Sequence, residues 1–195
     1  MNRRNFVIEA AVAGIAGGLM LAGCTTTSGS GDSAQTDASK RQAIDASVDG
    51  TLSRLFSTVQ GSHELAAKAQ GILVFPDVKK AAFIVGAAYG EGALRVGGAT
   101  VGYYSTAAAS FGFQAGAQST AIIFMFMTRD KLDSFRNAAG WSVGGDAAVS
   151  VIKVGANGTI DSTSASSQVV ALVLTNTGLM ADASLNGTKV TRMNL

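Results

Sequence analysis

Apolar residues recur at steps of three or four early in the chain, at Ile44, Val48, Leu52, Leu55 and Val59. This spacing places them along one side of an α-helix. The helix is expected to begin at Ser39, whose hydroxyl can cap it while Gln42 completes a capping box. Gly50 is a poor helix former and predicts a bend near the middle. A second, short helix is expected over residues 63–70, following Ser62.

From residue 71 the apolar pattern changes to a period of two, which is typical of β-strands. Residues 71–75 predict a strand that stops at Pro76, and residues 81–90 predict its hairpin partner. Asn-Gly pairs at 157–158 and 186–187 indicate hairpin turns, because both turn positions need positive φ; each is expected to join the strands beside it. The further expected strands are residues 93–96, 101–105, 111–117, 121–127, 147–154, 159–162, 169–174, 179–185 and 189–193.

One helix interrupts these strands. Thr128 can cap a helix over residues 129–138, in which Leu132 and Phe135 supply the apolar contacts, and Gly140 ends it. The whole pattern predicts an α+β fold. N-terminal helices are followed by a mostly antiparallel sheet that curls toward a barrel, with one inserted helix.

The first 23 residues have the layout of a secretory signal: Arg3 and Arg4, then an apolar stretch that ends in LAGC. This ending is similar to a bacterial lipobox, so the thiol of Cys24 is expected to receive a diacylglyceryl group. The alternative is a free thiol in a discarded leader. The Arg pair also resembles a twin-arginine signal, with ordinary Sec export as the other route.

Three segments follow from this pattern: a signal peptide at 1–23, a flexible tether at 24–38 and a folded domain at 39–195. Small polar residues without periodicity predict the tether. Thr25 follows the cysteine where an inner-membrane sorting Asp would stand, so the expected location is the outer membrane, through the lipid anchor. The longest apolar run of the domain, residues 121–127, is far too short to cross a bilayer as a helix.

The net charge of the chain limits which ligands are expected. Beyond residue 23 the chain carries 13 Lys and Arg against 12 Asp and Glu. So small a net charge provides no basic field for nucleic acid.

Motifs for catalysis are weak. Residues 140–144 fit the G-x-S-x-G pattern, but a helix precedes Ser142 and the one histidine, His63, lies far upstream, so a structural turn anchored by Trp141 is expected. One Cys and one His offer no metal cluster. We therefore expect no catalytic residue, metal or cofactor.

Basic residues near the first helix and strand are the candidate ligand-binding groups: Lys40, Arg41, Arg54, Lys79 and Lys80. An amphipathic helix with a basic flank can lie on an anionic bilayer. The alternative is that its apolar stripe packs on the sheet. Gln114 and Gln118 are expected to line a pocket or to face water.

Four motifs in order, at residues 71–92, 110–120, 126–135 and 178–188, resemble the SYLF domain family over Lys40 to Leu195. That family includes a eukaryotic phosphoinositide-binding domain, a fungal actin-binding protein and many bacterial lipoproteins. The resemblance implies binding of acidic phospholipid headgroups by a basic N-terminal helix, and Lys80 matches a family lysine. Residues 86–87 and 104–107 depart from the family pattern.

The sequence therefore predicts an envelope lipoprotein whose non-catalytic domain binds anionic phospholipids. An interaction module for an envelope or host protein is the alternative, and actin binding rests on the fungal relatives alone.

Overall fold

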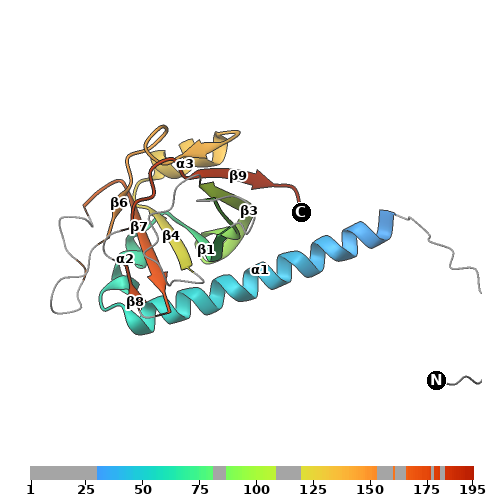
Figure 1. Cartoon of the computed structure of the whole chain (residues 1–195), viewed down its shortest axis with the longest axis horizontal. Helices are drawn as coiled ribbons and strands as arrows, with labels where there is room; N and C mark the ends of the chain where they lie inside the picture. The colour runs from blue at the N-terminus through green and yellow to red at the C-terminus, as the bar shows by residue number, and fades with distance from the viewer. Residues whose placement is uncertain are drawn as a thin grey trace, which may run out of the picture.

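The computed structural model describes residues 30–80, 87–108, 120–152, 160, 166–176, 178–180 and 183–195. These residues form three helices and one strongly curled sheet, which confirms the α+β prediction (Figure 1). The helices are α1 (Ser30–Thr58), α2 (Ser62–Lys68) and α3 (Arg129–Asn137). The strands are β1 (Gly71–Lys80), β2 (Ala88–Val96), β3 (Ala99–Ala108), β4 (Thr120–Phe126), β5 (Trp141–Ser142), β6 (Ser150–Val151), β7 (Val169–Thr175), β8 (Gly178–Leu179) and β9 (Lys189–Met193).

The strands lie in the order β5-β9-β3-β2-β1-β4-β7-β6, and β8 pairs with β7. All pairs between these strands are antiparallel except β6 with β7, so the mostly antiparallel prediction is confirmed. Strands β1, β2 and β3 form a meander. The last strand, β9, returns across the molecule to pair with β3.

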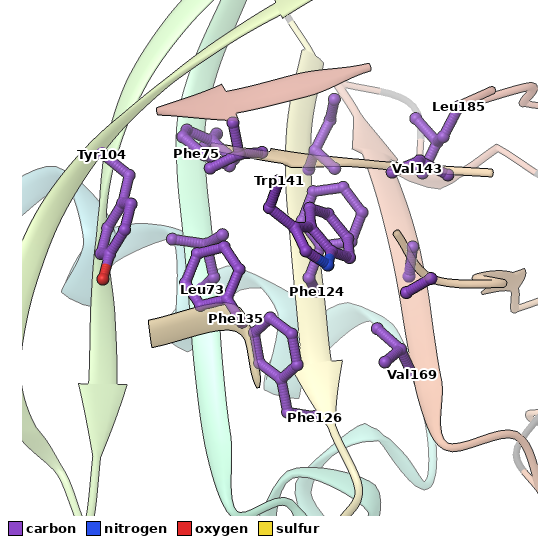
Figure 2. Close-up of a cluster of buried hydrophobic side chains, with 14 of the residues drawn as sticks. Leu73, Phe75, Tyr104, Phe124, Phe126, Phe135, Trp141, Val143, Val169 and Leu185 are labelled. Carbon is purple, nitrogen blue, oxygen red and sulfur yellow. The ribbon is translucent and has the colours of Figure 1, made fainter. Parts of the chain in front are cut away.

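One face of the sheet encloses an aromatic cluster (Figure 2). Trp141 of β5 meets Phe124 of β4 with ring centroids 5.5 Å apart, although four other strands separate β5 from β4 in the sheet order. The sheet must therefore curl over this face. Phe135 of α3 completes the cluster, packing on Phe126 at 4.8 Å and on Trp141 at 5.5 Å.

Helices α1 and α2 cover the opposite face. Ile44, Val48, Leu55 and Val59 are buried there with aliphatic residues of β1, β4 and β7. The apolar stripe of the first helix therefore packs on the sheet. Since both of its faces are covered, every residue of β4 is buried, and this strand shows a continuous apolar run instead of alternation.

The N-terminal boundary of the first helix was predicted wrongly. Helix α1 begins at Ser30, inside the expected tether, so Ser39 lies within the helix and cannot cap it. The helix is continuous through Gly50, with no break there. A helix fixed by packing extends at low cost, because only its first turn pays for nucleation. In Figure 1 the early turns of α1 project beyond the sheet.

Strand β1 does not stop at Pro76 as expected. It continues to Lys80, with a register shift against β2 between Val74 and Asp77. A bulge tolerates proline because the extra residue needs no ladder hydrogen bond. The hairpin partner is antiparallel as predicted, but it is the single strand β2, which includes the expected separate strand at 93–96.

The Asn-Gly pair at 186–187 and the residues before the second helix differ from the predictions. Asn186 and Gly187 form a turn, with Gly187 at φ 78°, but the strand that follows pairs with β3 and β5 instead of with residues 179–185. Gly61 occupies the N-cap position of α2. The buried Ser62 hydroxyl instead donates to the carbonyls of Leu55 and Val59 and ties α2 to the end of α1.

Of the expected strand at 147–154, residues 147–152 are described and form only the two-residue strand β6, while residues 153–154 lie outside the described ranges. The expected strand at 111–117 and the Asn-Gly pair at 157–158 lie outside the described residues. None of the helices in the described ranges is both long and apolar enough to cross a bilayer.

Candidate functional site

A groove of about 500 Å³ lies between the N-terminal half of α1 and strands β1 and β2. It brings together two of the predicted ligand-binding lysines, Lys40 and Lys79, which are 39 positions apart in the sequence. The lining residues are Lys40, Ala43, Ile44 and Ser47 of α1, Pro76, Asp77 and Lys79 of β1, and Tyr89, Gly90 and Glu91 of β2.

Two glycines let β1 lie close against β2 at the groove. A Cβ on Gly92 would lie 1.9 Å from the carbonyl oxygen of Val74, and one on Gly90 would lie 2.8 Å from Cγ2 of Val78. No side chain fits at either position without a shift of the backbone. Glu91 lies between these glycines, and its carboxylate reaches Lys40 of α1.

Glu91 is the polar centre of the groove. The Lys40 ammonium and the Tyr89 hydroxyl both donate to its Oε1, each at 2.9 Å. Burial and the bond to Glu91 raise the pKa of Tyr89, so the hydroxyl keeps its proton at neutral pH. The groove therefore has a fixed carboxylate bonded to two donors from different elements.

Lys79 forms the second charged pair. Its ammonium lies 2.7 Å from Oδ2 of Asp77, and its side chain is 69% exposed. The hydrogen bond to Asp77, followed by the charge of that carboxylate, raises the pKa of Lys79. Among the described lining residues, two cations and two carboxylates face the groove, so their charges cancel.

A polar latch holds α1 over β2 and β3 beside the groove. Arg95 lies 2.7 Å from Asp49 and 3.4 Å from Asp45. Thr100 and Tyr103 donate to the two oxygens of Asp45 at 2.7 and 2.8 Å. These bonds fix the α1 side of the groove together with the apolar packing of Ile44 and Val48.

The remaining predicted binding residues are not in the groove. Arg41 donates to the carbonyl oxygen of Leu195 at 2.7 Å. Arg54 is partly buried 14 positions after Lys40, roughly 20 Å further along the helix axis. Lys80 pairs through its backbone with Ala88, and its side chain is not described.

Three other predicted site residues, Cys24, Gln114 and Gln118, lie outside the described residues. Sequence reasoning missed Asp77, Tyr89 and Glu91. The two-residue period of a strand places Asp77 beside Lys79 and Tyr89 beside Glu91, so each local pair could have been found. Pairing of Lys40 with Glu91 depends on how α1 lies on the sheet.

Residues 140–144 include the short strand β5, and the turn that follows it occupies residues 144–146. Trp141 is buried, and Ser142 donates to Oδ2 of Asp146 through both its hydroxyl and its backbone N–H, each at 2.7 Å. These bonds hold the pKa of Asp146 below its usual range. His63 instead packs against Phe56, with ring centroids 5.1 Å apart. Within the described ranges, no group of three or more His, Cys, Asp or Glu could hold a metal ion.

The curled sheet, the covering helix and the groove of paired charges define an α+β binding domain. Residues 107–194 match the Ysc84 family model, described as Las17-binding protein actin regulator. This match supports the resemblance to the SYLF domain family that the motifs indicated. SYLF domains are lipid- and actin-binding modules. A comparison with curated proteins found no match. The matched segment includes β4 to β9, whereas the groove is built from residues 40–91.

Proposed function

We propose that this protein is an envelope lipoprotein, held at the outer membrane through acylated Cys24, whose domain binds acidic phospholipid headgroups without catalysing a reaction. The observation that carries the proposal is the convergence of Lys40 and Lys79 on one groove. The match of residues 107–194 to a family that binds lipids and actin supports it.

Both lysines can bind a lipid phosphate. Lys79 is largely exposed, and exposed ion pairs contribute little to stability, so its ammonium can turn from Asp77 to a phosphate. Lys40 can use its remaining N–H groups while it keeps Glu91. Tyr89, which is 49% exposed, presents the aromatic surface with a polar tip that is favoured where a bilayer meets water.

The lipid anchor and the groove have separate roles: the anchor attaches the domain to the membrane, and the groove binds headgroups. Acyl chains on Cys24 would keep the domain close to the bilayer surface, so that headgroup binding becomes a local event at high effective concentration. A groove with low affinity for a single headgroup is then sufficient for binding. Cations near an anionic surface contribute about 1 kcal/mol each.

Vesicle co-sedimentation tests the proposal. A full-length Cys24→Ser protein, which cannot be acylated, is mixed with vesicles that contain phosphatidylglycerol or only phosphatidylcholine. Binding should favour the anionic vesicles, weaken with salt, and fall about 5- to 30-fold in the double variant Lys40→Gln/Lys79→Gln. Lys68→Gln/Lys131→Gln removes two lysines outside the groove and should change binding less. Equal losses in the two double variants would contradict the proposal.

A second candidate function is protein binding, favoured by the description of the matched family model, which names a Las17-binding protein and actin regulation. Its partner would be an envelope or host protein. Crosslinking in cells should then capture one protein reproducibly, and anionic and neutral vesicles should bind equally poorly. Co-sedimentation with actin filaments tests the narrower actin hypothesis.

A further inference from the structure

We infer that the groove selects phospholipid headgroups that carry a primary ammonium beside the phosphate, the aminophospholipids. This inference rests on the proposed function and names the ligand class of the same site. It follows from the two carboxylates of the groove, which a site for a purely anionic headgroup would not need.

One carboxylate oxygen of Glu91, Oε2, is available for a further hydrogen bond. Its Oε1 accepts from Lys40 and Tyr89, while Oε2 accepts no bond from any residue in the described part of the chain. The side chain is only 28% exposed. The Oε2 atom of this partly exposed side chain can accept a further hydrogen bond, and a primary ammonium brings three N–H groups.

The charges of the groove alternate. Lys40 stands against Glu91 at 2.9 Å, and Lys79 against Asp77 at 2.7 Å. A headgroup with several negative charges would meet both lysines but would also be repelled by both carboxylates. A headgroup with a phosphate and an ammonium can place each group against the opposite charge. Alternation therefore favours a dipolar headgroup.

The apolar walls strengthen this pairing. Ala43, Ile44 and Pro76 line the groove together with the Tyr89 ring. Charges interact more strongly beside such walls than in bulk water. The ring face of Tyr89 is also a favourable neighbour for a cation. A quaternary ammonium would share this last contact, but it has no N–H to donate to Glu91.

Soluble phospholipids with two six-carbon chains provide the test, below their micelle concentrations, by calorimetric titration of the full-length Cys24→Ser protein. Phosphatidylserine is compared with phosphatidylglycerol, which has the same net charge but no ammonium. Phosphatidylethanolamine is compared with phosphatidylcholine, whose nitrogen is fully methylated. The ammonium-bearing lipid of each pair should bind about tenfold more tightly, as expected for one charge-assisted hydrogen bond.

Glu91→Gln should abolish this preference. The amide keeps an oxygen for Lys40 and Tyr89 but places an NH₂ group where the free oxygen was, so phosphatidylserine affinity should fall to that of phosphatidylglycerol. Glu64→Gln, on the exposed surface of α2, removes a carboxylate elsewhere and should leave the preference intact. If Glu91→Gln does not fold, the comparison of matched lipids on the Cys24→Ser protein decides.

Equal affinity within both lipid pairs would overturn the inference. If the affinity also falls in Lys40→Gln/Lys79→Gln, the proposed function survives without ammonium selection. If no lipid binds, or if the lysine variant binds all four lipids unchanged, the proposed function itself fails.

Discussion

The two faces of the sheet are held in different ways. On the enclosed face, Phe124, Phe126, Phe135 and Trp141 contact one another with ring centroids 4.8 to 6.1 Å apart. On the opposite face, α1 is held by aliphatic packing from Ile44 to Leu55 and by hydrogen bonds and ion pairs of Lys40, Asp45 and Asp49. Most of the stability is therefore expected from the enclosed face.

Because of this difference, the groove lies on the face where a change of contacts costs less stability. Aromatic packing loses free energy steeply when a side chain is removed, whereas exposed polar contacts lose little. A ligand that competes for Lys40 or Lys79 need not disturb the aromatic cluster. The contrast between an aromatic face and a face that combines aliphatic packing with polar contacts can be tested directly.

The largest effect should come from the aromatic cluster. Phe135→Ala removes a fully buried ring that joins α3 to the sheet and should lower the free energy of unfolding by about 3–5 kcal/mol in urea denaturation. Phe56→Ala, a partly buried ring of α1, should cost less than half as much. Equal losses would contradict the contrast between the faces.

A smaller loss of stability is expected where β1 pairs closely with β2. Gly92→Ala would force a Cβ to within 1.9 Å of the Val74 carbonyl oxygen and should destabilise the fold by about 3 kcal/mol. Gly50→Ala is the matched control, because a Cβ there meets nothing. It should stabilise the exposed helix by about 0.5–1 kcal/mol, and urea denaturation of both variants measures the difference. A neutral Gly92→Ala would show that the strands can move apart.

The polar latch should contribute less than the packed face. Asp45→Ala removes the acceptor of Thr100 and Tyr103 and should lower the free energy of unfolding by about 1–2 kcal/mol. Amide hydrogen exchange should accelerate in the N-terminal half of α1 before it does so around Leu55. Uniform acceleration along the helix would show that the latch and the apolar stripe act as one unit.

The smallest effect concerns Lys79. Asp77 raises its pKa above 10.5, so Asp77→Asn should lower this pKa toward that value in a side-chain NMR titration. The sign follows from linkage: the pair favours the fold below pH 10.5, and this contribution disappears as pH rises through the folded pKa. Because the lysine is exposed, the melting temperature at pH 7 should not change measurably. An unchanged pKa would mean that the pair does not form in solution.

The sequence predicted local structure well and distant pairing poorly. The stripe from Ile44 to Val59 and the apolar run in β4 follow from periodicity, and both were found. The bulge at Pro76 could not be predicted, because a proline ends a regular strand but is tolerated in an irregular one. The pairing of β9 with β3 joins residues more than 80 positions apart, which no turn signal specifies.

The candidate site shows the same limit. Basic residues near the first helix and strand were recognised, but proximity in sequence did not separate Lys40 and Lys79 from Arg41 and Arg54. Only the placement of α1 on β1 and β2 in the folded structure separates the two lysines from the two arginines. The prediction named only cations. It therefore missed Asp77 and Glu91, whose charges alternate with those of Lys79 and Lys40.

The central claim, that headgroups bind in the groove between α1, β1 and β2, is tested most directly by NMR of the isoleucine methyl groups. Ile44 lines the groove, whereas Ile122 and Ile123 are buried in the sheet. Titration of the Cys24→Ser protein with short-chain phosphatidylserine should shift the Ile44 signal in a saturable way and leave the signals of Ile122 and Ile123 unchanged. Saturable binding with an unmoved Ile44 signal would contradict the claim.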